Sequence, residues 1–306
     1  MRNVRCVWPR VTELGEGPIW SSADDALWFV DIKGHQIHRF DPATTGKKSW
    51  SAPDEVSFAA PCRDGGHVIG LPGRLALFNP STGTVEDLLE VEPEWPGNRL
   101  NDACVDAKGR LWFGSMDNDE SRPSGALYCW DGAASPRLCD RDFVISNGPA
   151  VSPDGRTLYH TDTRRRTIFR FEIAADGSVE GKRTFIEIPE DAGWPDGTAL
   201  DAEGRLWVAL WGGWGIRCYS PSGELVETVR LPCAHVTKLA FGGQDLKTAF
   251  VTTAWRGLAP DCREAQPLAG SLFAFDVDTP GLPQEALAIE PSRLRHAATP
   301  SASGTI

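Results

Sequence analysis

A repeat of about 44 residues constrains the fold of this chain more than any other feature of its sequence. Each copy contains a short segment rich in β-branched and aromatic residues, and successive segments are 41, 43, 47, 48 and 43 residues apart. The segments begin at Leu27, Val68, Leu111, Leu158, Leu206 and Ala249. Six units of this length, each built from short strands, are typical of propeller blades.

Turn residues indicate the order of strands within a copy. Pairs such as Asp154-Gly155 and Glu203-Gly204 precede the second strand, and segments such as IHRFDPATTG (37–46) end the third strand in a glycine-containing turn. Helical periodicity is largely absent. We therefore predict an all-β fold, a six-bladed β-propeller that forms a single domain over residues 1–290, followed by a flexible C-terminal tail over residues 291–306.

The two ends of a circular propeller are often joined within one blade. Residues 4–8 have the length and the apolar content of an edge strand. We expect this segment to pair with residues 271–277 and to close the ring.

Four copies carry an oxygen-bearing side chain 10 or 11 residues before their apolar segment. These are Glu16 in LGEGPIW, Asn101 in RLNDACV, Asn147 in ISNGPAV and Asp196 in WPDGTAL. Because the first strand of every blade lines the central channel, we expect the four side chains to converge on the propeller axis. Two carboxylates and two amides, without Cys or His, suit a hard or borderline divalent cation that keeps open positions. Calcium, zinc, manganese, magnesium and iron(II) all remain open.

Each of these residues also has a plainer interpretation as part of a turn. Asn-Gly and Asp-Gly pairs commonly form turns, and Glu16 lies between two glycines. Only the shared position in the repeat favours a site. Asn101 differs from the other three because Asp102 follows it where they have glycine.

Several motifs, in the right order, resemble those of the SMP-30/gluconolactonase/regucalcin family, and the chain is most similar to the bacterial sugar lactonases of that family. The resemblance extends from about Cys6 to about Val277. It rests on LGEGPIW with WFVDI, RLNDACVDAKGRLWFGSMD, SNGPAVSPDGRTLYHTDT, PDG with GRLWVALWGG, and VTKLAFGG with VTTA.

The resemblance implies one divalent metal ion, held in the channel of a six-bladed propeller by Glu16, Asn147 and Asp196. It also implies that Arg99, Asn101 and an acidic residue after Met116 contact substrate hydroxyls. Direct spacing favours Asp119 for that residue, and Glu120 is the alternative. The plainer interpretation of residues 117–122 is a charged, solvated loop.

The activity implied is hydrolysis of a sugar-acid lactone, such as xylono-, arabinono- or gluconolactone, to the free aldonic acid. A metal ion would polarise the ring carbonyl and acidify a water molecule, and Asp196 would be both ligand and proton shuttle. Trp211 and Trp214 are candidates for a wall or lid against the sugar. Two alternatives stay open: hydrolysis of another ester or a phosphotriester, and a non-catalytic calcium-binding or protein-interaction propeller.

Composition and missing motifs exclude several other classes. With 31 basic and 42 acidic residues the net charge is −11, which argues against a nucleic-acid partner. The chain lacks GxSxG, HExxH and Walker A motifs, and His160 fits a packed histidine better than a catalytic one. The sequence has no apolar stretch long enough for a membrane span, no apolar signal core near Met1 and no CxxC among its eight cysteines. We expect free thiols, a cytoplasmic location and no membrane partner, while the oligomeric state stays open.

Overall fold

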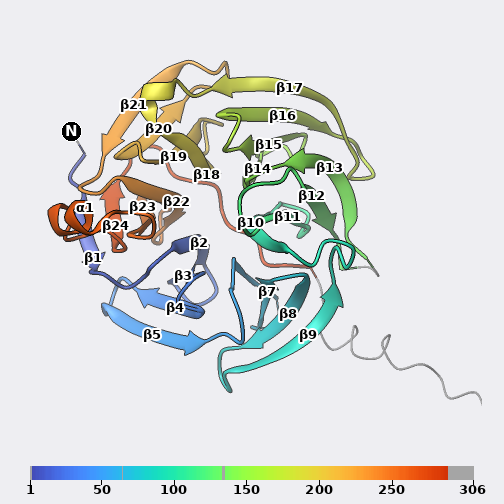
Figure 1. Cartoon of the computed structure of the whole chain (residues 1–306), viewed down its shortest axis with the longest axis horizontal. Helices are drawn as coiled ribbons and strands as arrows, with labels where there is room; N and C mark the ends of the chain where they lie inside the picture. The colour runs from blue at the N-terminus through green and yellow to red at the C-terminus, as the bar shows by residue number, and fades with distance from the viewer. Residues whose placement is uncertain (1, 64, 133–134, 289–306) are drawn as a thin grey trace, which may run out of the picture.

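A computed structural model describes residues 2–63, 65–132 and 135–288 of the chain. Within these ranges nearly all regular structure is β-strand, and the strands form antiparallel sheets. Figure 1 shows the sheets arranged around a central axis in a propeller-like ring. The prediction of an all-β, propeller-like fold is confirmed. The predicted tail over residues 291–306 lies outside the described residues.

Four sheets of the ring each contain four consecutive strands. The first contains β2 (Gly15–Ser21), β3 (Ala26–Asp31), β4 (Gln36–Asp41) and β5 (Gly46–Ser51). The second contains β6 (Ala59–Pro61), β7 (His67–Leu71), β8 (Arg74–Asn79) and β9 (Thr84–Glu90). The third contains β10 (Asn98–Val105), β11 (Leu111–Asp117), β12 (Gly125–Trp130) and β13 (Arg137–Phe143). The fourth contains β14 (Ser146–Val151), β15 (Thr157–Asp162), β16 (Thr167–Ile173) and β17 (Val179–Glu187).

The fifth sheet has eight strands, which form two groups of four. One group contains β18 (Trp194–Leu200), β19 (Leu206–Trp211), β20 (Gly215–Tyr219) and β21 (Leu225–Arg230). The other contains β22 (His235–Gly242), β23 (Thr248–Ala254), β24 (Leu272–Asp276) and β1 (Arg5–Trp8). The two groups are joined through the residue pair Trp211 and His235 of β19 and β22. The remaining elements are the 3-10 helix η1 (Glu190–Ala192) and the α-helix α1 (Pro260–Ala265), and no helix in the described ranges is long and apolar enough to cross a bilayer.

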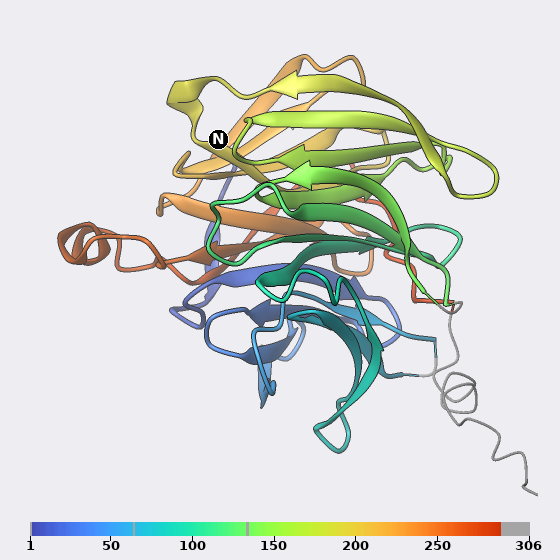
Figure 2. The same cartoon turned by 45° about the vertical axis from the view of Figure 1, so that its right-hand side comes forward.

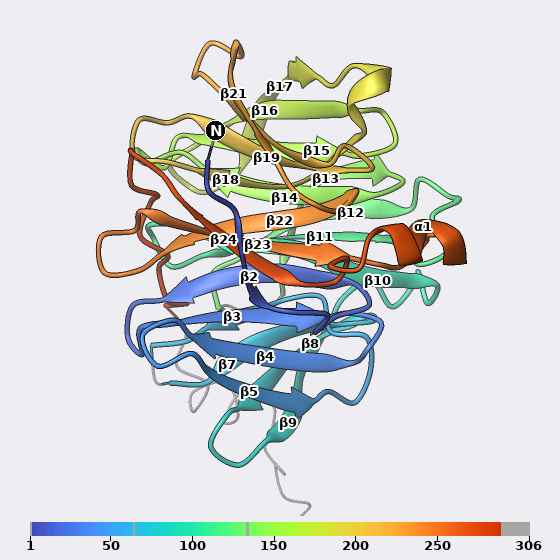
Figure 3. The ribbon, with the colours of Figure 1, turned by 90° about the vertical axis from the view of Figure 1, so that its left-hand side faces the viewer.

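The two ends of the ring meet at β1 and β24. These strands pair in antiparallel fashion, with Arg5 opposite Ala274 and Trp8 opposite Leu272. Figure 3 shows the N-terminal segment lying along this sheet. The expected closure between the N-terminal segment and residues 271–277 is confirmed.

Aromatic side chains fill the space between neighbouring groups of four strands. Across the point of closure, Trp20 of β2 stacks on Phe250 of β23 with ring centroids 5.9 Å apart. Trp207 of β19 packs edge-on against Phe241 of β22 at 5.8 Å. Large apolar area buried between sheets stabilises the ring, because isolated four-stranded sheets would leave their faces in water.

Five of the strands nearest the axis share one irregularity, a shift of register near their first residues, whereas β6 pairs without a shift. Such a bulge bends the strand and re-aims the side chains at that point. The shifts lie between Glu16 and Ile19, Leu100 and Ala103, Asn147 and Ala150, Pro195 and Thr198, and Val236 and Lys238. The equivalence that the repeat predicted is therefore a shared backbone feature.

The C-terminal described segment, residues 280–288, crosses the end of the channel at which the inner strands finish. It begins beside Leu200, which accepts a hydrogen bond from the Leu282 amide at 3.3 Å. It ends beside Pro61 and Gly109, which accept hydrogen bonds from Leu287 and Ala288 at 2.8 and 3.0 Å. Figures 1 and 2 show this red segment passing from one side of the ring to the other.

Candidate functional site

The side chains that the repeat singled out line one cavity of about 540 Å³ at the start of the inner strands. Glu16, Arg99, Asn101, Asn147 and Asp196 all line it and are each between 4% and 6% exposed. They come from four different strands, so only ring closure brings them together. Their convergence agrees with the expectation from the sequence, while their individual roles stay predictions.

A chain of hydrogen bonds orders the polar side of this cavity. Arg99 Nη1 donates to Asn101 Oδ1 at 2.6 Å, and Asn101 Nδ2 donates to Asn147 Oδ1 at 2.7 Å. Asn147 Nδ2 in turn donates to Thr163 Oγ1 at 3.1 Å, and that hydroxyl donates to the carbonyl of Pro195 at 2.8 Å. Each amide is therefore held in one orientation, with Asn101 positioning Asn147.

Glu16 and Asp196 are two buried carboxylates in the same cavity. Burial raises the pKa of Glu16 to about 8, and repulsion from Asp102 adds to the rise, while the Gly17 amide, Lys238 and Arg99 oppose it. Burial also raises the pKa of Asp196 well above its ordinary value, and repulsion from Glu16 contributes next. Burial and the repulsion between neighbouring carboxylates therefore disfavour the charged forms of both Glu16 and Asp196.

The donor set fits a divalent cation. Asp196 Oδ1 is buried and has no hydrogen-bond partner, which is costly for a carboxylate unless a cation or ligand meets it. Asn147 Oδ1 accepts one hydrogen bond and keeps a second lone pair. Within the described ranges no three His, Cys, Asp or Glu side chains form a metal-binding group by themselves. Glu16, Asp196 and the Asn147 amide would therefore need water or substrate to complete a coordination shell.

A tight turn after β11 presents the predicted acidic residues. Asp117 accepts hydrogen bonds from the Ser121 amide and hydroxyl, the Arg122 amide and the Arg122 guanidinium, at 2.8 to 3.1 Å. The hydrogen bond with Arg122 is the largest of the effects that lower the pKa of Asp117. The carboxylate of Asp117 thus shapes the turn, and Asp119 and Glu120 both line the cavity from it.

The two acidic candidates have different surroundings. Glu120 adopts a positive φ of 56°, which is uncommon for a residue with a side chain. Burial lowers the pKa of Arg99. Four carboxylates oppose that effect and are, from the largest contribution to the smallest, Glu55, Glu120, Glu16 and Asp196. Asp119 instead acts on Arg122, whose pKa is raised chiefly by Asp117. The charge of Glu120 therefore acts on Arg99 inside the cavity, whereas the charge of Asp119 acts on Arg122.

The aromatic candidates are only partly as expected. Trp211 lines the cavity and stacks on His235 with ring centroids 3.9 Å apart. Trp214 is 42% exposed and lies outside the cavity lining. Trp194, which sequence reasoning missed, lines the cavity with Arg166 over its ring at 4.4 Å. Its position directly before Pro195, at the start of an inner strand, was the available signal.

One further functional candidate was visible in the sequence only as a departure from the pattern. Asp102 stands where the other copies have glycine, and in the structure it is 2% exposed and paired with Lys238. Nothing in the repeat pointed to Lys238, because its partner is 136 residues away in the chain.

His160 and the cysteines agree with their expected roles. His160 is fully buried, its Nε2 lies 3.0 Å from Ser146 Oγ, and its ring packs edge-on against Phe143. The eight cysteines all lie within the described ranges, and no two of them form a disulfide. Neither group supplies a nucleophile to the cavity.

Comparison with known proteins identifies relatives along most of the chain. A 6-deoxy-6-sulfogluconolactonase of Pseudomonas putida is 30% identical over 280 residues, covering 91% of this chain and 96% of the relative. Regucalcin of Xenopus laevis is 33% identical over 280 residues, covering 89% of this chain and 93% of the relative. The crystal structure of a calcium-binding protein, regucalcin, from Agrobacterium tumefaciens superposes with a TM-score of 0.89 at 28% identity, covering 94% of this chain and 98% of that one.

The family described as the SMP-30/gluconolactonase/LRE-like region matches residues 14–255, a range that contains every inner strand of the cavity. This match and the relatives that span most of the chain agree with the motifs and with the site. The chain belongs to the SMP-30/gluconolactonase/LRE-like family.

Proposed function

We propose that this chain is a six-bladed propeller enzyme that uses one divalent metal ion to hydrolyse a sugar-acid lactone. The blade count follows from dividing the eight-stranded sheet at its single pair, Trp211 with His235, which leaves six groups of four strands. We further propose that these groups form one domain, because the closing strand β1 joins the two ends of the chain.

The observation that carries this proposal is the unpartnered oxygen of Asp196. Oδ1 is buried beside Glu16 and Asn147, in a cavity large enough for a small sugar. Glu16, Asn147 and Asp196 would hold the metal ion, whose identity among calcium, zinc, manganese, magnesium and iron(II) stays open. When bound, the ion would supply Lewis-acid polarisation of the lactone carbonyl.

The remaining side chains would bind and orient the sugar. Arg99 uses Nε and Nη1 for Asn118, Leu100 and Asn101, so its remaining amino group is available to substrate oxygens. Asn101 would contact the same hydroxyls while it positions Asn147. Of the two acidic candidates we propose Glu120, since its field reaches Arg99 and Asp196.

The chemistry that follows is addition of water and opening of the ring. Asp196 takes a proton from water as the water oxygen bonds to the carbonyl carbon. The bond between that carbon and the ring oxygen then breaks, and the ring oxygen receives the proton. The product is the open hydroxy acid.

The lactone class is supported by the Pseudomonas putida relative, which is named a 6-deoxy-6-sulfogluconolactonase. Xylono-, arabinono- and gluconolactones are the substrates to compare first. The Agrobacterium tumefaciens protein, which is described as calcium-binding, favours the second candidate, a propeller that binds calcium without turnover.

The test is the rate of ring opening of freshly prepared lactones by metal-stripped and metal-restored protein. We expect the metal to restore turnover and Asp196→Ala to lower kcat by about 10² to 10⁴. Asp191→Ala removes a nearby exposed carboxylate outside the cavity and serves as the matched control. A buffer control corrects for spontaneous opening. Tight calcium binding with buffer-level rates for every lactone would instead support the binding propeller.

A further inference from the structure

A buried ion pair crosses the channel beneath the two carboxylates, and the proposed reaction does not use it. Lys238 Nζ contacts Asp102 Oδ1 and donates to the carbonyl of Ala103, the latter at 2.9 Å. Asp102 is 2% exposed and Lys238 is 5% exposed. Asp102 belongs to β10 and Lys238 to β22, so the pair joins strands on two sides of the channel.

The pair touches the backbone next to the proposed metal ligands. Asp102 Oδ2 accepts a hydrogen bond from the Gly148 amide at 2.9 Å, directly after Asn147. The stem of Lys238 lies against Gly197, directly after Asp196, where an added Cβ would come within 2.5 Å of the Lys238 Cβ. Gly197 is therefore required by the lysine stem, and the ion pair fixes the backbone beside both residues.

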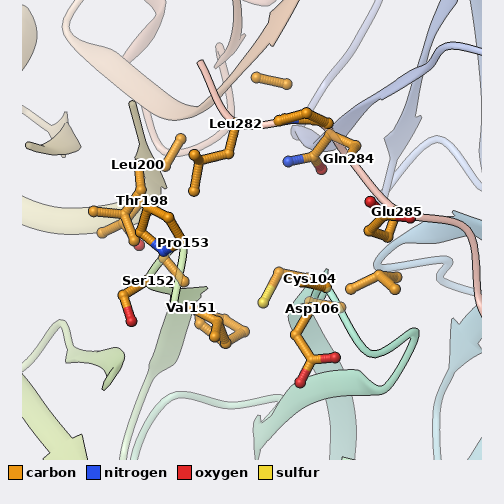
Figure 4. A pocket seen from close by; sticks show the side chains of 18 of the residues that line it. Cys104, Asp106, Val151, Ser152, Pro153, Thr198, Leu200, Leu282, Gln284 and Glu285 are labelled. Atoms are coloured by element: carbon orange, nitrogen blue, oxygen red, sulfur yellow. The ribbon is translucent and has the colours of Figure 1, made fainter. Parts of the chain in front are cut away.

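The same pair separates the site from a second cavity. This cavity has a volume of about 230 Å³ and lies where the inner strands finish. Figure 4 shows the side chains of Cys104, Leu200 and Leu282 around it. Lys238 lines it, whereas Glu16 and Asp196 line the cavity on the other side. The ion pair thus lies between the two cavities, behind the backbone of Asn147 and Asp196.

Stability alone is a weak reason for such a pair. Removing two charges from water costs free energy that their attraction only partly returns, so well-packed apolar residues often hold a core equally well. The charges of Asp102 and Lys238 also act on the neighbouring metal site, because electrostatic interactions in a buried channel are poorly screened.

We propose that Asp102 and Lys238 are positioning residues of this site, and that their opposite fixed charges set how strongly the channel attracts a divalent cation. The inference rests on the metal site of the proposed function. Asp102 adds a third buried carboxylate to Glu16 and Asp196, and the Lys238 ammonium offsets it. Loss of either partner leaves the other as an uncompensated charge beneath the ion.

Opposite effects of the two single substitutions test this. Calcium binding to metal-free protein is measured by titration calorimetry at pH 8 for the wild type, Lys238→Met, Asp102→Asn and the double variant. We expect Lys238→Met to tighten calcium binding by about tenfold or more and Asp102→Asn to weaken it by about tenfold or more. The double variant, which leaves no net charge, should return to within about threefold of the wild type.

A purely structural role gives a different pattern. It would move both single variants in the same direction, and that result, or affinities unchanged in both, would overturn the inference. Asp201→Asn removes another buried, cation-paired aspartate at the far end of β18 and should leave calcium affinity within about threefold. If Lys238→Met folds poorly by circular dichroism, Lys238→Gln removes the same charge while its amide can still donate to Ala103.

Lactone turnover measured in parallel separates this inference from the proposed function. Opposite shifts in calcium affinity without turnover would support the inference and reject the lactonase. Lactone turnover by the wild type, together with calcium affinities that shift in the same direction in both single variants, would support the lactonase and reject the inference. Absence of calcium binding in the wild type would overturn the inference directly.

Discussion

Asp119 and Glu120 are neighbours in one turn, and a single-residue substitution in each decides which contacts substrate. A lost charge-assisted hydrogen bond costs about 1.5–3 kcal/mol, so Glu120→Gln should lower kcat/KM by about tenfold or more. Asp119→Asn should stay within about twofold, because its field falls on Arg122. Steady-state kinetics on the best lactone checks this, and a larger effect at Asp119 would reverse the assignment.

His67 is a second residue with a measurable consequence. Both of its ring nitrogens are buried without partners, and burial lowers its pKa to about 4. The unfolded chain takes up this proton near pH 6.5, so it binds more protons than the folded chain between about pH 6.5 and 4. Stability from neutral His67 is therefore complete above pH 6.5 and falls by about 1.4 kcal/mol per pH unit below it.

His67→Phe should remove this dependence. Between pH 7.5 and 5.0 the wild type should lose about 2 kcal/mol relative to the variant in urea unfolding. The difference between the two proteins is the informative quantity, since Glu16 and Asp196 have raised pKa values and act in the opposite sense. Parallel pH profiles for the two proteins would show that His67 is not a neutral buried group.

At the scale of elements, one turn is built twice from the same seven-residue pattern. In DAKGRLW and DAEGRLW, Asp106 and Asp201 bond the guanidinium of the arginine four residues on and the indole of the tryptophan six residues on. The indole distances are both 2.9 Å. One carboxylate thus holds the turn between the first and second strands and orients a core tryptophan.

Asp201→Asn should destabilise the protein by about 2 kcal/mol, because the amide cannot accept all of these hydrogen bonds. Chemical denaturation measures the change. Glu203→Gln in the same turn is the matched control and should stay within about 0.5 kcal/mol, since its side chain is 63% exposed. Equal losses in the two variants would contradict the special role of the aspartate.

At the scale of the whole molecule, ring closure by β1 is the feature that holds both ends of the chain. Val7 and Trp8 pack against the apolar cluster that includes Phe29 and Phe40, and Arg5 pairs with Asp276 at 3.0 Å. Deleting residues 1–10 exposes this cluster and the edge of β24, so we expect a loss of about 3 kcal/mol or more and a melting temperature lower by about 5 °C or more.

Deleting residues 295–306, which lie outside the described ranges, should leave the melting temperature within about 2 °C. Differential scanning calorimetry of both truncations checks this. Equal tolerance to the two deletions would contradict closure through β1.

Much of the fold and of the site could be predicted from local patterns. The repeat indicated the propeller-like arrangement, since each copy carries its own strands and turns within about 44 residues. The shared position of Glu16, Asn101, Asn147 and Asp196 predicted one site, because equivalent positions in a ring face one axis. Trp214, a candidate for a wall or lid against the sugar, lies outside the cavity lining, because its place after β19 depends on the path of a loop rather than on strand register.

The sequence by itself determined what recurs at short range: the strands, their turns and the equivalence of four polar positions. Only the tertiary structure decided the ion pair behind the site, the path of residues 280–288 across the channel and the different surroundings of Asp119 and Glu120. The physical reason is separation along the chain. Asp102 and Lys238 meet across 136 residues, and no local period relates two residues that become neighbours only when the ring closes.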